Sequence, residues 1–307
     1  MPTRRFSIII TCYNQRDYIG DAVKSAISQG DQLKEVIVVD DASSDGSPEV
    51  LSQYAEAIQV IEFPRNRGAP EARNRGAASA QGEYLVFLDG DDLLLPWALD
   101  VYDRIVSERK PKVVLGRLTW FEGPIPSVVD MDVPRNIEFV DYEALILRDR
   151  PFRASASVYV VDRAIFWGAG GWSHEIFQLD DVDLAAKLGF SGHAVLICSP
   201  ATALHRVHAA NSIHTVPPFL RNLRLLAEKE RAGRYPGGPA RRYDRRAYLG
   251  GPFFFWTKRA LCAGLYKDAL RLAAFGWLLI LTAVVRRSLA RMEGRRPVEV
   301  IGLTHNL

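Results

Sequence analysis

One segment constrains the fold most strongly: the apolar run Tyr84–Leu88, which ends abruptly in the acidic residues Asp89, Asp91 and Asp92. Such a continuous run is typical of a strand buried on both faces in a parallel sheet. Three carboxylates within four residues repel one another unless a cation offsets their charge. A divalent metal ion with oxygen ligands is the leading candidate for that cation, and a solvated acidic turn that caps the next helix is the alternative.

Strands and helices alternate along the first 90 residues. Strand-like apolar runs cover residues 6–10, 35–39, 58–63 and 84–88, and helix signals occupy the intervening segments. This alternation predicts a parallel α/β sheet. Polar clusters at Thr11–Asn14, Asp40–Ser47 and Asp89–Asp92 follow three of the strands, and ligands of open α/β sheets bind at that edge. The motifs GxGxxG and GxxxxGK[ST] are absent from the sequence, which argues against the usual dinucleotide and P-loop sites.

Charge divides the chain into two parts. Residues 217–307 contain 18 Lys and Arg against 6 Asp and Glu, or +12, whereas residues 1–216 contain 21 against 30, or −9. We therefore expect a catalytic domain over residues 1–216 and a helical, basic and apolar extension over residues 217–307. A basic tail suggests an anionic partner such as a membrane surface or a phosphorylated lipid. Nucleic acid also fits the charge, but the sequence has no recognisable nucleic-acid module, so we expect none as a partner.

The tail contains an almost wholly apolar run, Leu272–Val285, flanked by arginines. As a helix its 14 residues span about 21 Å, which is short of the roughly 30 Å core of a bilayer. The length predicts an interfacial or buried helix rather than a span, and periodicity alone does not separate a membrane-surface helix from one packed on the domain.

The cysteines and the N-terminus indicate the compartment. Cys12, Cys198 and Cys262 lie far apart and form no metal-spaced pair, as expected for thiols in a reducing environment. The first residues, MPTRRF, lead straight into a strand without a signal-peptide core. We expect a cytoplasmic protein, with peripheral attachment to the inner membrane face as a further expectation.

Several motifs occur in a specific order and spacing: Thr11–Asn14, VVDDASSDGS (38–47), the RNRG…ARNRG pair (65–76), GEYLVFLDGDDLLLP (82–96), Gly170–Trp172 and Asp180–Leu184. Together they resemble the motifs of family 2 glycosyltransferases. The resemblance covers about residues 6–215 and implies the GT-A fold, a Rossmann-like, mostly parallel sheet flanked by helices. It also implies inverting transfer of a sugar from a nucleotide-diphospho-sugar to an acceptor hydroxyl in cell-surface polysaccharide or glycolipid synthesis.

The resemblance assigns residues to the donor and its metal ion. Asp41 would accept a hydrogen bond from the donor base, and the remaining donor-binding residues would be Thr11, Tyr13, Asn14, Gly68, Arg73, Asp89 and Gly90. Asp89 and Asp91 match the DxD pair that positions ribose and a Mn²⁺ or Mg²⁺ ion, with Asp91 as the direct ligand. His208 lies where related enzymes contact diphosphate or metal, and a structural histidine is the alternative.

The later motifs carry the acceptor side of the implied reaction. Asp181 matches the catalytic base, which takes a proton from an acceptor hydroxyl whose pKa is far above 7. Asp180 stands beside it, where the family often has Glu, and is assigned to acceptor binding. Trp172 is expected either to stack on the acceptor sugar or to be a buried aromatic residue. The expected partners are a UDP-sugar and a glycan or lipid-linked acceptor at the inner leaflet.

Two other functions remain open. A nucleotidyltransferase is also an α/β enzyme with metal-bound carboxylates, but it would usually have a glycine-rich loop with Lys or Arg where this chain has Thr11–Asn14. A non-catalytic nucleotide-sugar-binding module is the second alternative. Such a module would be a transferase that has lost its catalytic residues. The chain keeps the carboxylates expected of an active enzyme, which argues against this alternative: Asp41, Asp89, Asp91 and Asp181.

Overall fold

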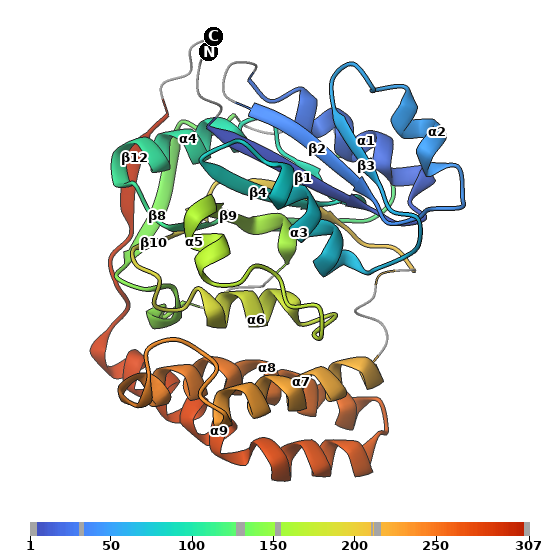
Figure 1. Cartoon of the computed structure of the whole chain (residues 1–307). Coiled ribbons are helices and arrows are strands. Elements are labelled where there is room, and N and C mark those ends of the chain that lie inside the picture. Colours follow the sequence, from blue (N-terminus) through green and yellow to red (C-terminus); the bar gives the residue numbers. More distant parts are fainter. Residues whose placement is uncertain are drawn as a thin grey trace.

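The computed structural model describes residues 5–30, 34–126, 133–150, 155–209, 211 and 216–303. Its centre is a nine-stranded sheet (Figure 1). The strands lie in the order β12 (Glu299–Gly302), β8 (Asn136–Tyr142), β10 (Ala194–Ser199), β6 (Val113–Leu115), β9 (Tyr159–Asp162), β4 (Tyr84–Asp89), β1 (Phe6–Cys12), β2 (Lys34–Asp40) and β3 (Gln59–Glu62).

The half of the sheet built from the first 90 residues is parallel, as predicted: β3, β2, β1 and β4 all pair in parallel. The register sets Thr11 beside Asp89 and Cys12 beside Asp40, so the polar clusters meet at one edge. Beyond β4 the sheet is mixed, because β9 runs antiparallel to both β4 and β6, and β8 runs antiparallel to β10. The expected α/β class is confirmed, and the parallel arrangement holds for this first half.

A second, three-stranded sheet brings distant residues to the acidic run. It consists of β5 (Leu93–Leu94), β11 (Ala203–Arg206) and β7 (Leu118–Phe121). The strand β5 follows the acidic run directly, and β11 pairs with it antiparallel, with Leu204 opposite Leu93. The residues after β11 therefore reach Asp91 although they lie more than 110 positions away in sequence.

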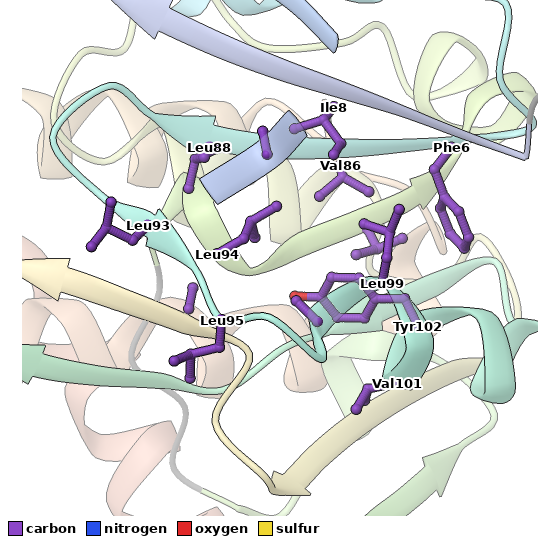
Figure 2. Packing of buried hydrophobic residues seen from close by; sticks show 14 of the residues in the cluster. Phe6, Ile8, Val86, Leu88, Leu93, Leu94, Leu95, Leu99, Val101 and Tyr102 are labelled. Carbon is purple, nitrogen blue, oxygen red and sulfur yellow. The ribbon is translucent and has the colours of Figure 1, made fainter. Parts of the chain in front are cut away.

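Helices cover both faces of the large sheet. Alternate residues of β1 point in opposite directions, so Ile8 and Ile10 enter one apolar cluster and Ile9 enters another. The first cluster includes residues of α1 (Arg16–Ile27), α2 (Ser47–Ser52) and α4 (Ala98–Arg109). Figure 2 shows its side chains from β1 and β4 packed with Leu99 and Tyr102 of α4. The second cluster includes residues of α3 (Ala69–Ser79), α5 (Arg163–Gly168) and α6 (Asp180–Lys187).

The tail folds into a layer of its own, built from α7 (Val216–Arg231), α8 (Arg242–Cys262) and α9 (Tyr266–Glu293). Figure 1 shows this layer on the side of α6 that faces away from the sheet, with α9 outermost. A third apolar cluster joins these helices to Val182 and Ala186 of α6. After α9 the chain returns to the large sheet, where β12 pairs with β8.

Helix α9 is longer than the sequence indicated. It has 28 residues rather than 14 and spans about 42 Å, because charged and small residues on both sides of the apolar run continue the helix. The prediction that it is too short to cross a bilayer is therefore wrong. Residues 266–290 are long and apolar enough to cross a membrane by length and composition alone. The helix packs closely on α8, since a Cβ at Gly276 would clash with the ring of Phe253.

Candidate active site

The acidic run after β4 is anchored through Asp92. The Asp92 carboxylate is fully buried and accepts a hydrogen bond from the Ser157 hydroxyl (2.6 Å) and from the backbone N–H of Arg206 (3.2 Å). Nδ1 of His205 lies 2.8 Å from the same carboxylate. Burial, with repulsion from Asp91, raises the pKa of Asp92 to about 6 against the opposing effect of His205. Asp92 therefore fixes the run in place and faces away from solvent.

Asp91 has the partners expected of a metal ligand. Its Oδ2 lies 2.9 Å from Nε2 of His208 and 3.5 Å from Nδ2 of Asn211. The His208 ring stacks on Tyr18 with ring centroids 4.8 Å apart, which fixes its orientation. Among the described residues, no group of three or more His, Cys, Asp or Glu could hold a metal ion. Asp91 and His208 supply two suitable donors, a number that fits ions completed by substrate phosphates and water.

Gly90 lies where the chain has no room for a side chain. A Cβ at this position would lie 2.5 Å from the backbone oxygen of Thr11 and would also clash with the side chain of Gln15. The requirement for glycine is thus set by the close approach of β1 to the acidic run. That approach holds Asp89 and Asp91 at the edge of the sheet, as the register of β1 and β4 also indicates.

Arg73 of α3 joins the two acidic motifs. Its guanidinium donates to Oδ1 of Asp89 (2.7 Å) and to Oδ2 of Asp180, and only 6% of the residue is exposed. Burial acts to lower the pKa of Arg73, but the two carboxylates raise it above its ordinary value. The neighbouring Asn74 holds the backbone of Trp172 through two hydrogen bonds of 2.8 and 2.9 Å. The ARNRG motif therefore links the acidic run after β4 to Asp180 and to the backbone of Trp172.

Of the two alternatives predicted for Trp172, the structure shows the second, a buried aromatic residue. Only 1% of it is exposed, and its ring packs edge-on against Phe87 and Tyr159. The Arg73 guanidinium covers the ring with its carbon 4.7 Å from the centroid. Because protein groups occupy its surroundings, the ring is not open to stack on a sugar in this conformation. The ring instead packs against the guanidinium of Arg73.

Asp181 is the second residue of α6 and differs from its acidic neighbours. In the part of the chain that the structure describes, its carboxylate has no ion pair and accepts one hydrogen bond, from the backbone N–H of Val182 (2.7 Å). Burial and the charge of Asp180 raise the pKa of Asp181 to about 7. The Tyr159 hydroxyl donates to the backbone carbonyl of Asp181 (2.8 Å) and holds the start of the helix. A carboxylate with a pKa near 7 is suited to accept a proton at physiological pH.

Asp41 organises the predicted base-binding corner. Its two carboxylate oxygens accept the backbone N–H groups of Arg67 (2.6 Å) and Gly68 (2.7 Å). Burial raises the pKa of Asp41 against these two hydrogen bonds. Each carboxylate oxygen keeps a lone pair for a further donor. The carboxylate thus holds the loop after β3 and can still accept a hydrogen bond from a ligand.

The remaining donor-side predictions lie nearby and differ in exposure. Tyr13 is 49% exposed and can reach a ligand, whereas Thr11 is largely buried at the end of β1. Asn14 has a left-handed backbone, accepts from the N–H of Ser44 (2.8 Å) and donates its own N–H to Ser43 (2.9 Å). Asn14 therefore clamps the loops after β1 and β2 together.

Sequence reasoning missed the residues that hold the site together. No sequence motif marks Ser157 or His205. Ser157 contacts Asp92 from the turn before β9, and His205 contacts it from the second sheet. Asp183 lies within the recognised acidic motif, but two of its partners, Lys229 and Tyr235, lie in the tail. The available signal was the alternation of acidic residues at the start of α6, which places Asp183 on a different face from Asp181.

The fold resembles known glycosyltransferases over nearly the whole chain. Residues 1–349 of TarS from S. aureus, in complex with UDP-GlcNAc, match with a TM-score of 0.70 and 17% identity, covering 95% of this chain and 92% of that one. The mannosyltransferase PcManGT from Pyrobaculum calidifontis, in complex with GDP-Man and Mn²⁺, matches with a TM-score of 0.54 and 18% identity, covering 93% and 88%. The architecture is therefore that of the GT-A glycosyltransferases.

The sequence comparison finds a match to a known family. Residues 7–140 match the family described as Glycosyl transferase family 2. A similar curated protein is the putative teichuronic acid biosynthesis glycosyltransferase TuaG of Bacillus subtilis, 46% identical over 89 residues, which make up 28% of this chain and 35% of TuaG. The match thus spans about a third of that relative. The resemblance stated from the motifs is confirmed.

Proposed function

We propose that this chain is an inverting glycosyltransferase that transfers a sugar from a nucleotide-diphospho-sugar to an acceptor hydroxyl, with Asp181 as the catalytic base. The observation that carries the proposal is the arrangement of Asp89, Arg73 and Asp180 in one chain of ion pairs that ends beside Asp181. Asp181 alone in this arrangement keeps its carboxylate free of a cation among the described residues. A donor-binding edge and a proton acceptor therefore lie on either side of one arginine.

The proposed reaction is a single displacement. The acceptor oxygen forms a bond to the anomeric carbon while the bond from that carbon to the diphosphate oxygen breaks. The acceptor proton passes to the Asp181 carboxylate, and the nucleoside diphosphate leaves with the electron pair. Arg73 keeps Asp180 from competing for the proton, because the guanidinium engages it directly. Inversion follows when base and leaving group lie on opposite faces of the sugar, as in inverting hydrolases.

A UDP-sugar is the donor that we propose. TarS, the structural neighbour with the TM-score of 0.70, is bound to UDP-GlcNAc. In this chain Asp41 has the free lone pairs to accept the N–H of a pyrimidine base, and an unmatched base would leave this buried carboxylate without its partner. The exposed ring of Tyr13 lies at the same edge and can cover the base.

We propose that Asp91 and His208 hold a Mn²⁺ or Mg²⁺ ion, with Asp89 directed to the ribose. The Asp91 carboxylate and the His208 imidazole lie 2.9 Å apart, and both donor types bind such ions. When bound, the ion would neutralise charge on the leaving diphosphate. PcManGT, the other structural neighbour, carries Mn²⁺ together with GDP-Man. The further ligands would come from the diphosphate and from water.

A nucleotide-sugar screen tests the donor and the reaction together. Thermal shift and nucleotide release are measured with UDP-, GDP-, dTDP- and CMP-sugars, each with and without Mn²⁺, for the wild type and for Asp181→Asn. We expect stabilisation of both proteins by one nucleotide class with metal, and slow release of nucleotide from the wild type alone. Binding without release by either protein would favour a non-catalytic module. No response to any donor would contradict the proposal.

For the acceptor we propose a cell-surface glycan or its lipid-linked precursor, reached from the cytoplasmic face of a membrane. TuaG, the curated relative, is named for teichuronic acid biosynthesis. All three cysteines are free, as suits a reducing compartment. The outer face of α9 supplies the contact, because its apolar side chains are exposed at positions three, four and seven apart: Leu270, Trp277, Leu281, Val284, Val285 and Met292.

The opposite face of α9 is already buried against α8, so docking on a membrane would lay the tail flat on its surface. The tail carries a charge of +12, which an anionic lipid surface would neutralise. If a second copy of the chain bound to the same face, two tails of charge +12 would lie together and repel each other. Anionic lipid is therefore the occupant that we propose.

Vesicle co-sedimentation tests this contact. Trp277→Glu is compared with Trp167→Glu, which changes an exposed tryptophan (42%) of α5 away from the tail. We expect the wild type and Trp167→Glu to bind vesicles that contain anionic lipid, and Trp277→Glu to lose most of that binding. Equal binding by all three proteins would refute the proposal, as would a dimer that forms through Trp277 without any vesicle binding.

A further inference from the structure

The carboxylate of Asp183 is completely buried two residues after the proposed base. It accepts hydrogen bonds from the hydroxyl of Ser173 (2.5 Å) and from that of Tyr235 (2.7 Å). Nζ of Lys229 lies 2.7 Å away and Nζ of Lys187 lies 3.6 Å away. Burial alone would raise the pKa of Asp183, but the two lysines lower it below its ordinary value. The carboxylate is therefore held as an anion.

Two of these partners belong to the tail. Lys229 lies in the last turn of α7, and Tyr235 lies in the turn that follows α7. Lys229 is 9% exposed, and its ammonium also reaches the Ser173 hydroxyl (3.1 Å). The tail therefore contributes a buried cation and a phenol to a carboxylate of the catalytic layer. A buried charge is tolerated only with such partners, so each contact fixes the position of the other side.

The rest of α6 is enclosed by the same helices. Val182 and Ala186 belong to the apolar cluster of the tail, whereas Leu184 and Ala185 belong to the cluster under the sheet. The hydroxyl of Tyr248 in α8 donates to the carbonyl of Val182 (3.3 Å). With eight residues, α6 is too short to be stable alone, so its packing partners determine where it lies.

We propose that the tail helices α7 and α8 position the catalytic base, and that Asp183, Lys229 and Tyr235 are the positioning residues. The proposal rests on the role of Asp181 given above. The donor-side residues Asp41 and Asp91 contact other segments and no part of the tail among the described residues. A fault in the tail contacts should therefore misplace the base and leave donor binding intact.

Three variants separate positioning from stability. Lys229→Met removes the buried cation, Tyr235→Phe removes one hydrogen bond, and Glu230→Gln changes the next residue. Glu230 is the matched control because it is also buried (2% exposed, against 9% for Lys229) but pairs with Arg245, which is also in the tail. We expect Lys229→Met to lower kcat about 100-fold with an unchanged donor KM, since a misplacement of about 1 Å has such effects. Tyr235→Phe should lower kcat about tenfold.

The control variant should lose thermal stability and keep its kcat when assayed well below its Tm. Hydrogen exchange of the α6 backbone gives a second readout that needs no turnover. We expect faster exchange in α6 for Lys229→Met than for Glu230→Gln. If α6 exchanges equally in both variants, or if Lys229→Met keeps its kcat or raises the donor KM, the tail does not position the base. If the wild type itself has no transferase activity while α6 exchange responds as expected, the proposed function fails and the structural coupling stands.

Discussion

The acidic runs at positions 89–92 and 180–183 are nearly alike in composition, meet at the same arginine, and are held in different ways. Each buries its last carboxylate completely. Asp92 is held by a serine hydroxyl, an imidazole and a backbone N–H from the second sheet and its neighbouring turn. Asp183 is held by two lysines, a serine and a tyrosine, and half of these come from the tail.

Asp91 in the first run and Asp181 in the second also differ in their partners. Asp91 faces an imidazole at 2.9 Å, whereas among the described residues the carboxylate of Asp181 accepts a hydrogen bond only from a backbone N–H, at 2.7 Å. A carboxylate with a second ligand beside it is suited to a metal ion, and one without a cation is suited to a proton. Composition alone thus does not assign the roles of two such runs. The different neighbours of Asp91 and Asp181 support the roles that we propose for them.

Exchanging one carboxylate in each run should separate the two roles most sharply. We expect Asp181→Asn to lower kcat by about 10²- to 10⁴-fold, the contribution of a general base, while metal-dependent donor binding persists. Asp91→Asn should instead weaken that binding. Isothermal titration with donor nucleotide and Mn²⁺, together with transfer rates, measures both. The comparison breaks if Asp181→Asn loses donor binding or if Asp91→Asn keeps it in full.

The arginine between the runs offers the largest change in stability. We expect Arg73→Met to destabilise the protein by about 3–5 kcal/mol, because it leaves the buried Asp180 and the part-buried Asp89 without their cation. Arg104→Met is the control, since its ion pair with Glu108 lies on the surface and should contribute less than about 1 kcal/mol. Urea unfolding of both variants measures the difference. Equal losses would mean that the bridge contributes nothing beyond a surface pair.

The sequence was most informative where one strand end carries one motif. The parallel strands, the position of the acidic run at their edge and the polar clusters beside it all follow from apolar runs followed by polar residues, and the structure confirms them. Local patterns did not predict the contacts made across long separations. The approach of His205 to Asp92 depends on β11, which has four residues and no distinct pattern.

The tail shows the same limit. Its helical character is predicted correctly, but the apolar run alone does not give the length of α9, because charged and small residues extend the helix on both sides. Which of its side chains would meet Asp183 depended on how α7 packs against α6, and no local pattern records this packing. The ion pairs of Arg73 were likewise hidden, although the motif that contains it was recognised.

A glycine exchange tests whether the first run depends on close backbone packing. We expect Gly90→Ala to destabilise the protein by about 1–3 kcal/mol, as overpacking does, and to weaken donor binding by displacing Asp91. Gly168→Ala is the control, because nothing lies within 4 Å of a Cβ there. Thermal unfolding and donor titration measure both effects. Wild-type donor affinity in Gly90→Ala would show that the proposed metal ligand Asp91 does not need this contact.

The acid limb of the pH profile tests the second run without changing its structure. Because the base must be ionised, kcat/KM should fall about tenfold for each pH unit below the pKa of Asp181, which is raised to about 7. The raised pKa also affects folding. The protonated Asp181 contributes stability at low pH, and this contribution is lost as the pH rises through about 7. Asp181→Asn should therefore gain in Tm relative to the wild type between pH 5 and pH 8, while its residual rate loses the acid limb. A limb that persists in Asp181→Asn would assign the titration to another group and leave the base unidentified.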